Sequence, residues 1–308
     1  MMVVFRKIKT MICRFRQFGI INSCRIWVSP MIHFSSTERK TKYHEAILNY
    51  LQKRYGYIIE EFAMAKVPQN VLGQNSCIWM CWFQGEQFAP PLIQSCIKQV
   101  QKFKGNHPLV ILNKENINRY CSLPAYIWEK LEKEKISYTH FSDILRNALL
   151  AQHGGIWLDA SIFLTSNLDS WNLAYFTIKQ QIPDDKRFVS GYKWTGFCQG
   201  GVQGNPVNSF VYRMFLEYHK KEKGLVDYYL IDYFMALGYR NIPAIKTLID
   251  NVPYNNKELY YMKEKMLETF NKDEFEKIKQ NTGIFKLKQR VFTDNENSLY
   301  TYLIKNES

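Results

Sequence analysis

Three charged side chains near the middle of the chain have the types and spacing to handle a diphosphate and a divalent cation. Asp143 and Arg146 stand three positions apart in an apolar segment, so on a helix they share one face. Asp159 directly follows the apolar run IWL, which is typical of a short buried strand. Ligands bind beyond the carboxyl ends of strands in open parallel sheets, and Mg²⁺ and Mn²⁺ prefer oxygen ligands. Asp159 is therefore the first candidate metal ligand.

Transfer of a sugar from a nucleotide donor is a reaction that such a group would serve. The leaving diphosphate needs a cation, the cation needs a carboxylate to hold it, and polar groups must orient the sugar. Arg146 is suited to pair with the diphosphate, and Asp143 to accept a hydroxyl group of the sugar. The alternative is that Asp143 and Arg146 form an ordinary ion pair worth roughly a few tenths of a kcal/mol, and that Asp159 only ends a strand.

The segments around these residues alternate between strand and helix, as in α/β proteins. Strands are expected at residues 77–83, 107–113 and 156–159, and helices at 43–62, 92–103, 142–153 and 227–239, with helical parts in 116–135. Ser142 is the expected N-cap of one helix, and Gly154 with Gly155 is its expected end. The first strand, the helix after it and the second strand have lengths that predict a parallel pair joined by a crossover.

The later part of the chain gives weaker signals. GFCQGGVQGNP at 196–206 is interpreted as a glycine-rich loop, either a plain turn or an active-site loop, which opens onto a helix after Pro206. The charged stretch from Lys257 to about residue 280 is expected to be helical, and FKLKQR at 285–290 to be a short basic strand or turn. No internal repeat interrupts this order.

The chain is basic, with 41 Lys and Arg against 28 Asp and Glu and a formal net charge of +13. Such an excess favours nucleic acid, an acidic membrane surface or phosphorylated substrates as partners. Much of it lies before Glu38, the first acidic residue. Residues 3–18 place apolar side chains on one side of a helical wheel and basic ones on the other, which predicts either contact with an anionic membrane or a helix packed on the protein's own core.

The cysteines and the N-terminus indicate a cytoplasmic protein. Seven scattered cysteines form no CxxC pair and no zinc spacing, which is typical of reduced thiols. Arg14 and Arg16 interrupt what would be the apolar part of a signal peptide, and no segment is apolar enough to span a bilayer. The expected location is the cytoplasm, with a peripheral position on the inner face of the cell membrane if the basic segment binds lipid.

The stretch FSDILRNALLAQHGGIWLDASIFL (141–164) resembles the helix–strand core of the capsular polysaccharide synthesis proteins, relatives of glycosyltransferase family 32 and, more remotely, of the glucosylating domains of large clostridial toxins. The order S-D-I-L-R followed by G-G-x-x-L-D is the most specific part. The resemblance extends over roughly residues 70–290 and includes IWMCWFQGEQFAPPLIQSCIKQV, VILNKENINRY, QGNP, VDYYLIDYFM, VPYNN and FKLKQR.

This resemblance implies an α/β fold of the GT-A type, with a mostly parallel central sheet and added N-terminal and C-terminal helices. It implies a glycosyltransferase that uses a nucleotide-sugar donor, expected to be a UDP-sugar, with Mn²⁺ or Mg²⁺, and that acts with retention on an oligosaccharide or lipid-linked glycan. The expected regions are a basic amphipathic segment (1–36), a helical lead-in (37–68), a GT-A-like catalytic domain (69–256) and a charged helical region that completes the site (257–308).

The resemblance also implies roles for single residues. Trp82 would lie at the nucleotide pocket, Asp143 and Arg146 would bind the donor, and Asp159 would be the first acid of a DxD motif. Gly154 and Gly155 would permit the turn into the metal strand, with Gly155 at the donor site. Lys286 and Lys288 would close over the phosphates.

The motif departs from DxD, because it reads Asp159-Ala160-Ser161. Ser161 is a neutral and weak metal ligand, so the missing charge would have to come from Asp232 or Asp227. Metal binding is thereby left open. Three other functions remain as alternatives: a nucleic-acid-binding protein, which the lack of a known module disfavours, a non-catalytic relative that binds sugars, and a glycoside hydrolase.

Overall fold

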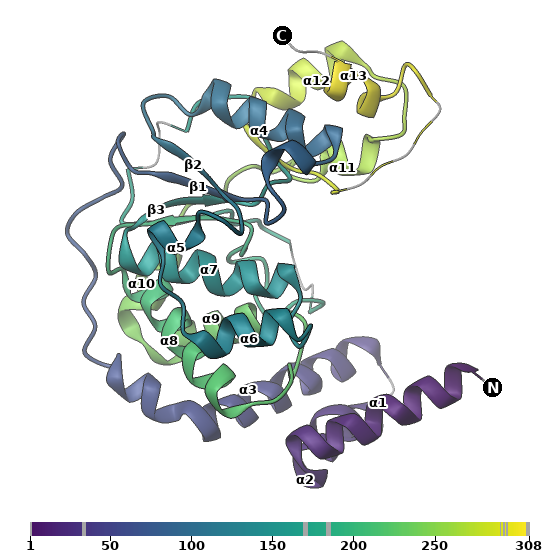
Figure 1. The fold of residues 1–308 in the computed structure, drawn as a ribbon, viewed down its shortest axis with the longest axis vertical. Coiled ribbons are helices and arrows are strands. Elements are labelled where there is room, and N and C mark those ends of the chain that lie inside the picture. Colours follow the sequence, from purple (N-terminus) through teal and green to yellow (C-terminus); the bar gives the residue numbers. More distant parts are fainter. Residues whose placement is uncertain are drawn as a thin grey trace.

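The computed structural model describes residues 2–32, 35–168, 172–182, 186–289, 291, 293 and 295–305. A central five-stranded sheet lies between two groups of helices (Figure 1). Its order is β2-β1-β3-β6-β5, with β1 at Ile78–Cys81, β2 at Leu109–Leu112, β3 at Gly155–Leu158, β5 at Tyr175–Thr177 and β6 at Cys198–Gly201. The mostly parallel α/β sheet that the sequence predicts is confirmed.

The parallel part of the sheet is built by the expected crossover. The strand β1 is parallel to β2, with Ile78 opposite Leu109, and parallel to β3, with Ile78 opposite Ile156. The helix α4 (Pro91–Phe103) connects β1 to β2. Because all three strands run the same way, their carboxyl ends meet at one edge, and Asp159 follows β3 there.

The segment expected to be a glycine-rich loop contains the buried antiparallel strand β6, so that expectation is wrong in part. Its glycines are needed because the strand packs closely: a Cβ on Gly201 would lie 2.3 Å from Nδ2 of Asn205, and a Cβ on Gly200 would lie 3.1 Å from the carbonyl oxygen of Gly155. The helix after it begins at Pro206 as expected, with Asn205 as its N-cap.

Several helices form the layer on the other side of the sheet from α4 (Figure 1). They are α5 (Ile117–Tyr120), α6 (Ala125–Glu132), α7 (Tyr138–Gln152), α8 (Pro206–Lys221), α9 (Leu230–Asn241) and α10 (Pro243–Asp250). The N-cap of α7 is Ser137, whose side chain accepts a hydrogen bond from the backbone of His140, so the expected cap at Ser142 is wrong. Ser142 lies inside the helix and donates to the carbonyl of Thr139.

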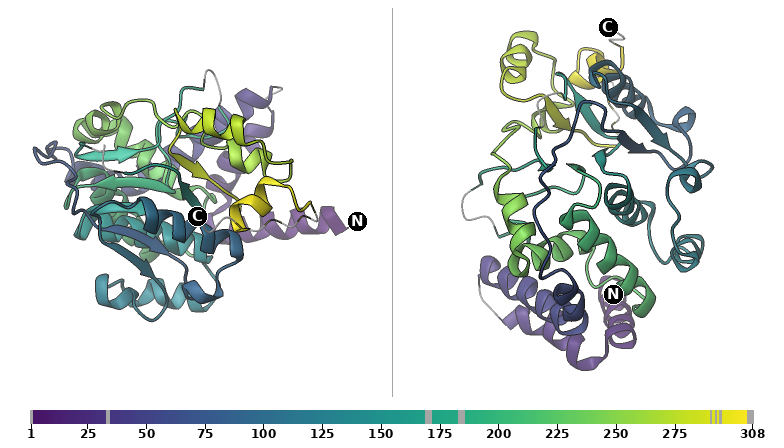
Figure 2. Two further views of the ribbon diagram at one scale, coloured as in Figure 1. Left: turned by 90° about the horizontal axis from the view of Figure 1, so that it is seen from above. Right: turned by 90° about the vertical axis from the view of Figure 1, so that its left-hand side faces the viewer.

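The C-terminal part adds a small sheet next to Asp159. The strand β4 (Ile162–Leu164) pairs antiparallel with β7 (Ile284–Lys286), and Ile162 lies opposite Lys286. The helices α11 (Tyr261–Lys265), α12 (Lys272–Lys279) and α13 (Leu299–Lys305) pack there with α4 around a second hydrophobic core (Figure 2). The expected basic strand near 285–290 is therefore present, and its partner is the strand that follows Asp159.

The N-terminal helices lie at the opposite end of the molecule from α11–α13 (Figures 1 and 2). They are α1 (Met2–Phe18), α2 (Ile20–Ser23), the π-helical η1 (Cys24–Val28), the 3₁₀ turn η2 (Ser29–Ile32) and α3 (Ser36–Glu61); a further 3₁₀ turn, η3, spans Glu86–Phe88. The helix α3 continues through Gly56 without a break. Phe18 packs on Trp27, so part of the apolar side of α1 is covered by the protein itself.

The helix α3 ties this end to the rest of the protein through one buried carboxylate. Glu222, which follows α8, accepts hydrogen bonds from Tyr50 (2.8 Å) and Tyr55 (3.0 Å) and pairs with Arg54. Within the part of the chain that the structure describes, no helix combines the length and apolar character that crossing a bilayer requires.

Candidate active site

The carboxylate of Asp159 is held by three donors. Its Oδ1 accepts from Nη2 of Arg146 at 3.0 Å and from the indole Nε1 of Trp157 at 2.9 Å. Its Oδ2 accepts from Nζ of Lys286 at 2.9 Å. The backbone of Asp159 is fixed as well, since its N–H donates to the carbonyl of Phe197 at 2.8 Å. This side chain is therefore held at the carboxyl end of β3, the position at which the sequence predicts a ligand site.

Arg146 joins the two aspartates that the sequence singles out. Its Nη2 atom lies 3.1 Å from Oδ1 of Asp143 and 3.0 Å from Oδ1 of Asp159. The guanidinium also lies over the ring of Trp157, 5.3 Å from its centroid. Gly196 covers it closely, because a Cβ there would lie 2.6 Å from Nη1 of Arg146. The pair Asp143–Arg146 is thus a buried element of the site and not a surface ion pair.

Lys286 reaches the same carboxylate from the other end of the chain. Its Nζ lies 2.9 Å from Oδ2 of Asp159 and 2.7 Å from Oγ of Ser161, so it bridges the first and third positions of the motif. Two backbone contacts set its position: its N–H donates to the carbonyl of Leu259 at 2.9 Å, and Leu287 donates to the carbonyl of Ser161 at 2.9 Å. The ammonium group lies over the ring of Phe197, with Nζ 4.9 Å from the ring centroid.

The charged groups of the site form two levels. The side chain of Arg146 is only 4% exposed, whereas those of Lys286 and Asp159 are 19% and 25% exposed. A ligand that enters from solvent therefore meets Lys286 and Asp159 first, and Arg146 lies deeper. The Nε atom of Arg146 is buried and has no hydrogen-bond partner among the described residues.

Burial and neighbouring charges move the pKa values of the two aspartates in opposite directions. Burial raises the pKa of Asp143 to about 7, with Arg146 opposing the shift and Asp159 and Asp232 adding to it. Burial also raises the pKa of Asp159, but Lys286 and Arg146 lower it by more, so its net pKa is below the usual range. Asp159 is therefore ionised at neutral pH, while Asp143 takes up and releases a proton near neutrality.

Asp232 lies close enough to affect this group but has its own partner. On the first turn of α9, it accepts a hydrogen bond from Nε1 of Trp194 at 2.9 Å. Burial raises the pKa of Asp232 to about 6, against the effects of Trp194 and Arg146. Asp227 is held elsewhere, by the hydroxyl of Tyr43 at 2.8 Å.

The other residues expected at the site lie at different places. Trp82 follows β1, and its indole N–H is buried without a partner among the described residues. Gly155 begins β3, four residues before Asp159, so the two residues lie about 13 Å apart along the strand. Lys288 is exposed, and no described contact joins it to Asp159. The structure thus brings together Asp143, Arg146, Asp159, Ser161 and Lys286, and leaves Gly155 and Lys288 apart.

The residues present do not fit a divalent cation in the manner of a DxD motif. The described residues contain no group of three His, Cys, Asp or Glu side chains placed to hold a metal ion. Each oxygen of Asp159 already accepts from a cationic side chain, and the hydroxyl of Ser161 accepts from Lys286. An ammonium group therefore stands between the two side chains expected to bind the metal, and a cation there would meet direct charge repulsion.

Sequence reasoning missed two residues of the site. Trp157 and Gly196 gave no hint by charge or motif, since their roles depend on Arg146 lying between them. A tryptophan two positions before a strand-end aspartate shares its side of the strand, and period-2 alternation is the signal that would have pointed to Trp157.

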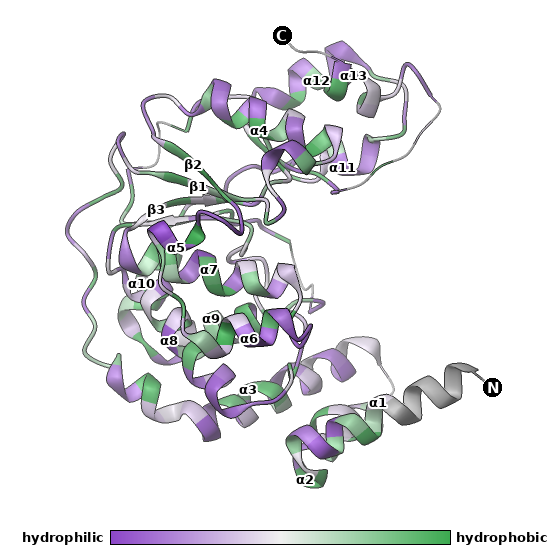
Figure 3. Ribbon diagram, viewed as in Figure 1, coloured by the Kyte–Doolittle hydropathy of each residue, from purple (hydrophilic) through white to green (hydrophobic). Residues whose placement is uncertain are grey.

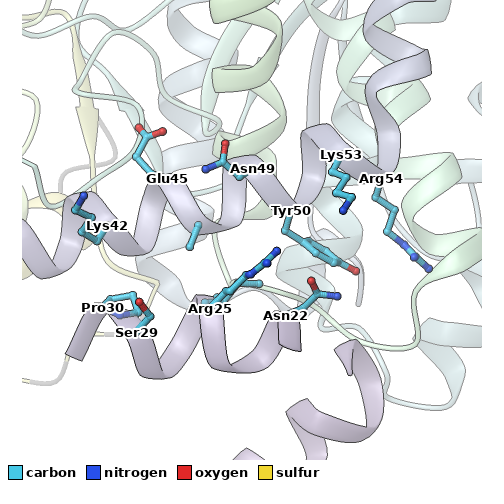
Figure 4. A pocket seen from close by; sticks show the side chains of 12 residues that line it. Asn22, Arg25, Ser29, Pro30, Lys42, Glu45, Asn49, Tyr50, Lys53 and Arg54 are labelled. Atoms are coloured by element: carbon cyan, nitrogen blue, oxygen red, sulfur yellow. The ribbon is translucent and has the colours of Figure 1, made fainter. Parts of the chain in front are cut away.

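A basic groove of about 710 Å³ lies away from this site, between η1, η2 and α3 (Figure 4). Its charged and amide lining residues are Asn22, Arg25, Lys42, Glu45, Asn49, Lys53 and Arg54. Glu45 pairs with Arg240 and Arg54 with Glu222, so the remaining cations Arg25, Lys42 and Lys53 give the groove its positive charge. The groove contains none of the residues that contact Asp159.

Comparisons with known proteins agree with the resemblance seen in the sequence. A family model described as capsular polysaccharide synthesis protein matches residues 29–305. No curated protein matches the chain. Similar solved structures include the PaToxG glycosyltransferase (16% identity, 79% of this chain and 94% of that chain, TM-score 0.41). Another is a transferase mutant (13% identity, 61% and 91%, TM-score 0.39). Neither likeness is close enough to assign a function.

Proposed function

The chain belongs to the capsular polysaccharide synthesis protein family, and we propose that it is a glycosyltransferase that moves a sugar from a nucleoside-diphosphate donor to a capsular or other cell-surface glycan. The observation that carries this proposal is the contact of Arg146 and Lys286 with one carboxylate, Asp159, at the carboxyl end of β3. Two cations held at a strand end are suited to an anionic leaving group. The expected donor is a UDP-sugar.

In the proposed reaction the bond between the anomeric carbon and the diphosphate oxygen breaks, and both electrons stay with the diphosphate. An acceptor hydroxyl oxygen bonds to the anomeric carbon as it passes through an oxocarbenium-like state. With retention, the acceptor attacks from the side that the diphosphate leaves, and its proton passes to the departing diphosphate oxygen. Lys286 neutralises the charge that develops there, and Asp159 with Arg146 keeps Lys286 in position.

Asp143 and Trp82 are the proposed contacts to the rest of the donor. Asp143 has a pKa near neutrality, so it accepts a hydrogen bond from a sugar hydroxyl when ionised and donates one when protonated. The indole N–H of Trp82 is buried and unpaired among the described residues at the end of β1, which supports a role as a donor to the nucleotide.

The test is a thermal-shift panel of UDP-, GDP- and CDP-sugars, with ATP and NAD as unrelated nucleotides. A ligand that binds only the native state raises the melting temperature. A rise with a UDP-sugar, followed by release of UDP in the presence of a glycan acceptor, supports the proposal. No rise with any nucleoside diphosphate would overturn it, and binding without turnover would favour a non-catalytic relative.

We also propose that the N-terminal segment contacts an anionic membrane. Ile20, Ile21, Met31 and Ile32 are 68%, 69%, 70% and 72% exposed. Figure 3 shows apolar residues of α2 at the outer end of the molecule, and the basic groove lies beside them. Exposed apolar side chains next to cations suit an interface of acyl chains and anionic headgroups.

A further inference from the structure

We infer that the ammonium group of Lys286 is the built-in cation of this site and takes the place of the divalent metal ion, so that nucleoside diphosphates bind without metal. The inference rests on the proposed function for the identity of the ligand. Its own basis is the position of one side chain relative to the Asp159-Ala160-Ser161 motif.

The position of Lys286 is the position of a metal ion in such a motif. Its Nζ contacts Oδ2 of Asp159 at 2.9 Å and Oγ of Ser161 at 2.7 Å. These are the first and third side chains of the motif, the two that would coordinate a cation. An ammonium group carries three N–H donors, and the described residues provide acceptors for two of them. The third is available to a phosphate oxygen.

The replacement of the second acid by serine is explained by this arrangement. A DxD pair carries two negative charges, which suit a cation of charge +2. Here one carboxylate and one hydroxyl surround a cation of charge +1, so the charge of the pair Asp159–Lys286 is balanced. The neutral hydroxyl of Ser161 therefore suits a lysine partner, and its presence does not mean that a metal ligand has been lost.

The lysine is also placed rigidly, as a built-in cation requires. Lys286 ends β7, directly opposite Ile162 in the antiparallel pair of β4 and β7. The backbone on both sides is hydrogen-bonded, to Leu259 and to Ser161. With its position set by the pairing of two strands, Lys286 loses little freedom when a diphosphate binds. The ring of Phe197 covers one side of the ammonium group and leaves less room for water.

The first arm of the test uses Mn²⁺ alone. Free Mn²⁺ is measured by electron paramagnetic resonance during titration of metal-free full-length protein, so no nucleotide is needed. We expect no stoichiometric binding to the wild type. The double variant Lys286→Met with Ser161→Asp removes the ammonium group and supplies a second carboxylate, and it is expected to bind one Mn²⁺. Stoichiometric binding of Mn²⁺ by the wild type would overturn the inference.

The second arm measures UDP binding by calorimetry in chelator and in Mn²⁺. The wild type should bind UDP equally well in both, within about two-fold, whereas Lys286→Met should lose about ten-fold or more. Lys286→Arg, which keeps the charge, should retain more affinity than Lys286→Met. Lys277→Met, a change of an exposed lysine on α12, is the matched control and should bind as the wild type does.

The outcomes separate this inference from the proposed function. A requirement for Mn²⁺ in UDP binding by the wild type, or full affinity in Lys286→Met, contradicts the inference and leaves a nucleotide-sugar enzyme intact. Absence of UDP binding in every condition contradicts the proposed function. In that case the Mn²⁺ arm still decides whether Lys286 occupies the cation position. Melting temperatures of all variants show which of them fold.

Discussion

Arg146 and Asp159 stand 13 positions apart in the chain, yet Nη2 of Arg146 lies 3.0 Å from Oδ1 of Asp159. The contact connects the middle of α7 to the end of β3, so it fixes how the helix sits against the strand as well as the direction of the carboxylate. Because Arg146 is almost fully buried, we expect its effect on donor binding to pass mainly through Asp159.

Arg146→Met should weaken binding of a UDP-sugar by about ten-fold or more, because Asp159 loses a partner and turns from its present direction. The measurement is calorimetry with the UDP-sugar that gives the largest thermal shift. Arg213→Met is the matched control, since Arg213 also pairs with two carboxylates, Glu61 and Glu217, but on the surface of α8. Equal affinity of the two variants would show that Arg146 serves stability alone.

Asp159→Asn should remove nearly all turnover, and Ser161→Ala should remove much less. The amide cannot balance the charges of Arg146 and Lys286, whereas the serine provides only one neutral acceptor to Lys286. Rates of UDP release with a glycan acceptor, measured in Mn²⁺, in Mg²⁺ and in chelator, test both changes. A near-normal rate for Asp159→Asn would mean that the reaction centre lies elsewhere.

Asp143→Asn should change the pH dependence of stability. The pKa of Asp143 is raised to about 7 in the folded protein from 3.8, so its contribution to stability is complete below pH 4 and is lost as the pH rises to about 7. The asparagine variant lacks this loss. Its free energy of unfolding relative to the wild type should therefore rise by at most ~1.4 kcal/mol per pH unit over that range and stay level above it.

Urea unfolding of Asp143→Asn and wild type between pH 2 and pH 9 measures this difference. A difference that does not change with pH would show that Asp143 keeps an ordinary pKa in the folded protein. A difference that falls with rising pH would show that its ion pair with Arg146 outweighs the effect of burial.

Gly155→Ala should destabilise the protein by about 3 kcal/mol or more. A Cβ at this position would lie 2.3 Å from the carbonyl oxygen of Cys77, and the backbone has a φ of +104°. Gly73→Ala is the control, because a Cβ at Gly73 meets nothing within 4 Å, and its effect should be within about 0.5 kcal/mol. Thermal unfolding compares the two; equal melting temperatures would contradict the expected strain.

Ile20→Asp combined with Ile21→Asp should reduce sedimentation with vesicles that contain anionic lipid. The change puts negative charge on two of the exposed apolar residues of the N-terminal segment. Met64→Asp combined with Val71→Asp alters two exposed apolar residues outside that segment and is the control. If both double variants sediment as the wild type does, or the wild type stays in solution, the proposed membrane contact is wrong.

The sequence predicted those elements that depend on patterns of neighbouring residues. The strands of the crossover have unbroken apolar runs, and α7 ends at Gln152, two residues before Gly154, which has a φ of +69°. The order of Asp143, Arg146 and Asp159 was also visible, because helix and strand periodicity place them without long-range information. These elements and their parallel arrangement are present in the structure.

What could not be predicted depends on contacts between distant segments. The strand β6 contains two glycines, because neighbouring backbone leaves no room for side chains, and this makes it look like a loop. The bridge from Lys286 to Ser161 joins residues 125 positions apart, and it arises only when β7 pairs with β4. The family resemblance placed Lys286 at the phosphates, but the sequence could not show that this lysine contacts Asp159 and Ser161, the residues expected to hold a metal ion.

The pairing of β4 with β7 also has a consequence for synthesis on the ribosome. Lys286 meets Asp159 across 127 positions of sequence. At roughly 5–20 residues per second, translation from one residue to the other takes about 6–25 s. Over this interval the nascent chain contains Asp159 and Arg146 but not yet Lys286, the second cation that contacts the carboxylate. A chain released before β7 is made would therefore lack the cation that we propose for the leaving diphosphate, and the site is complete only once β7 has paired with β4.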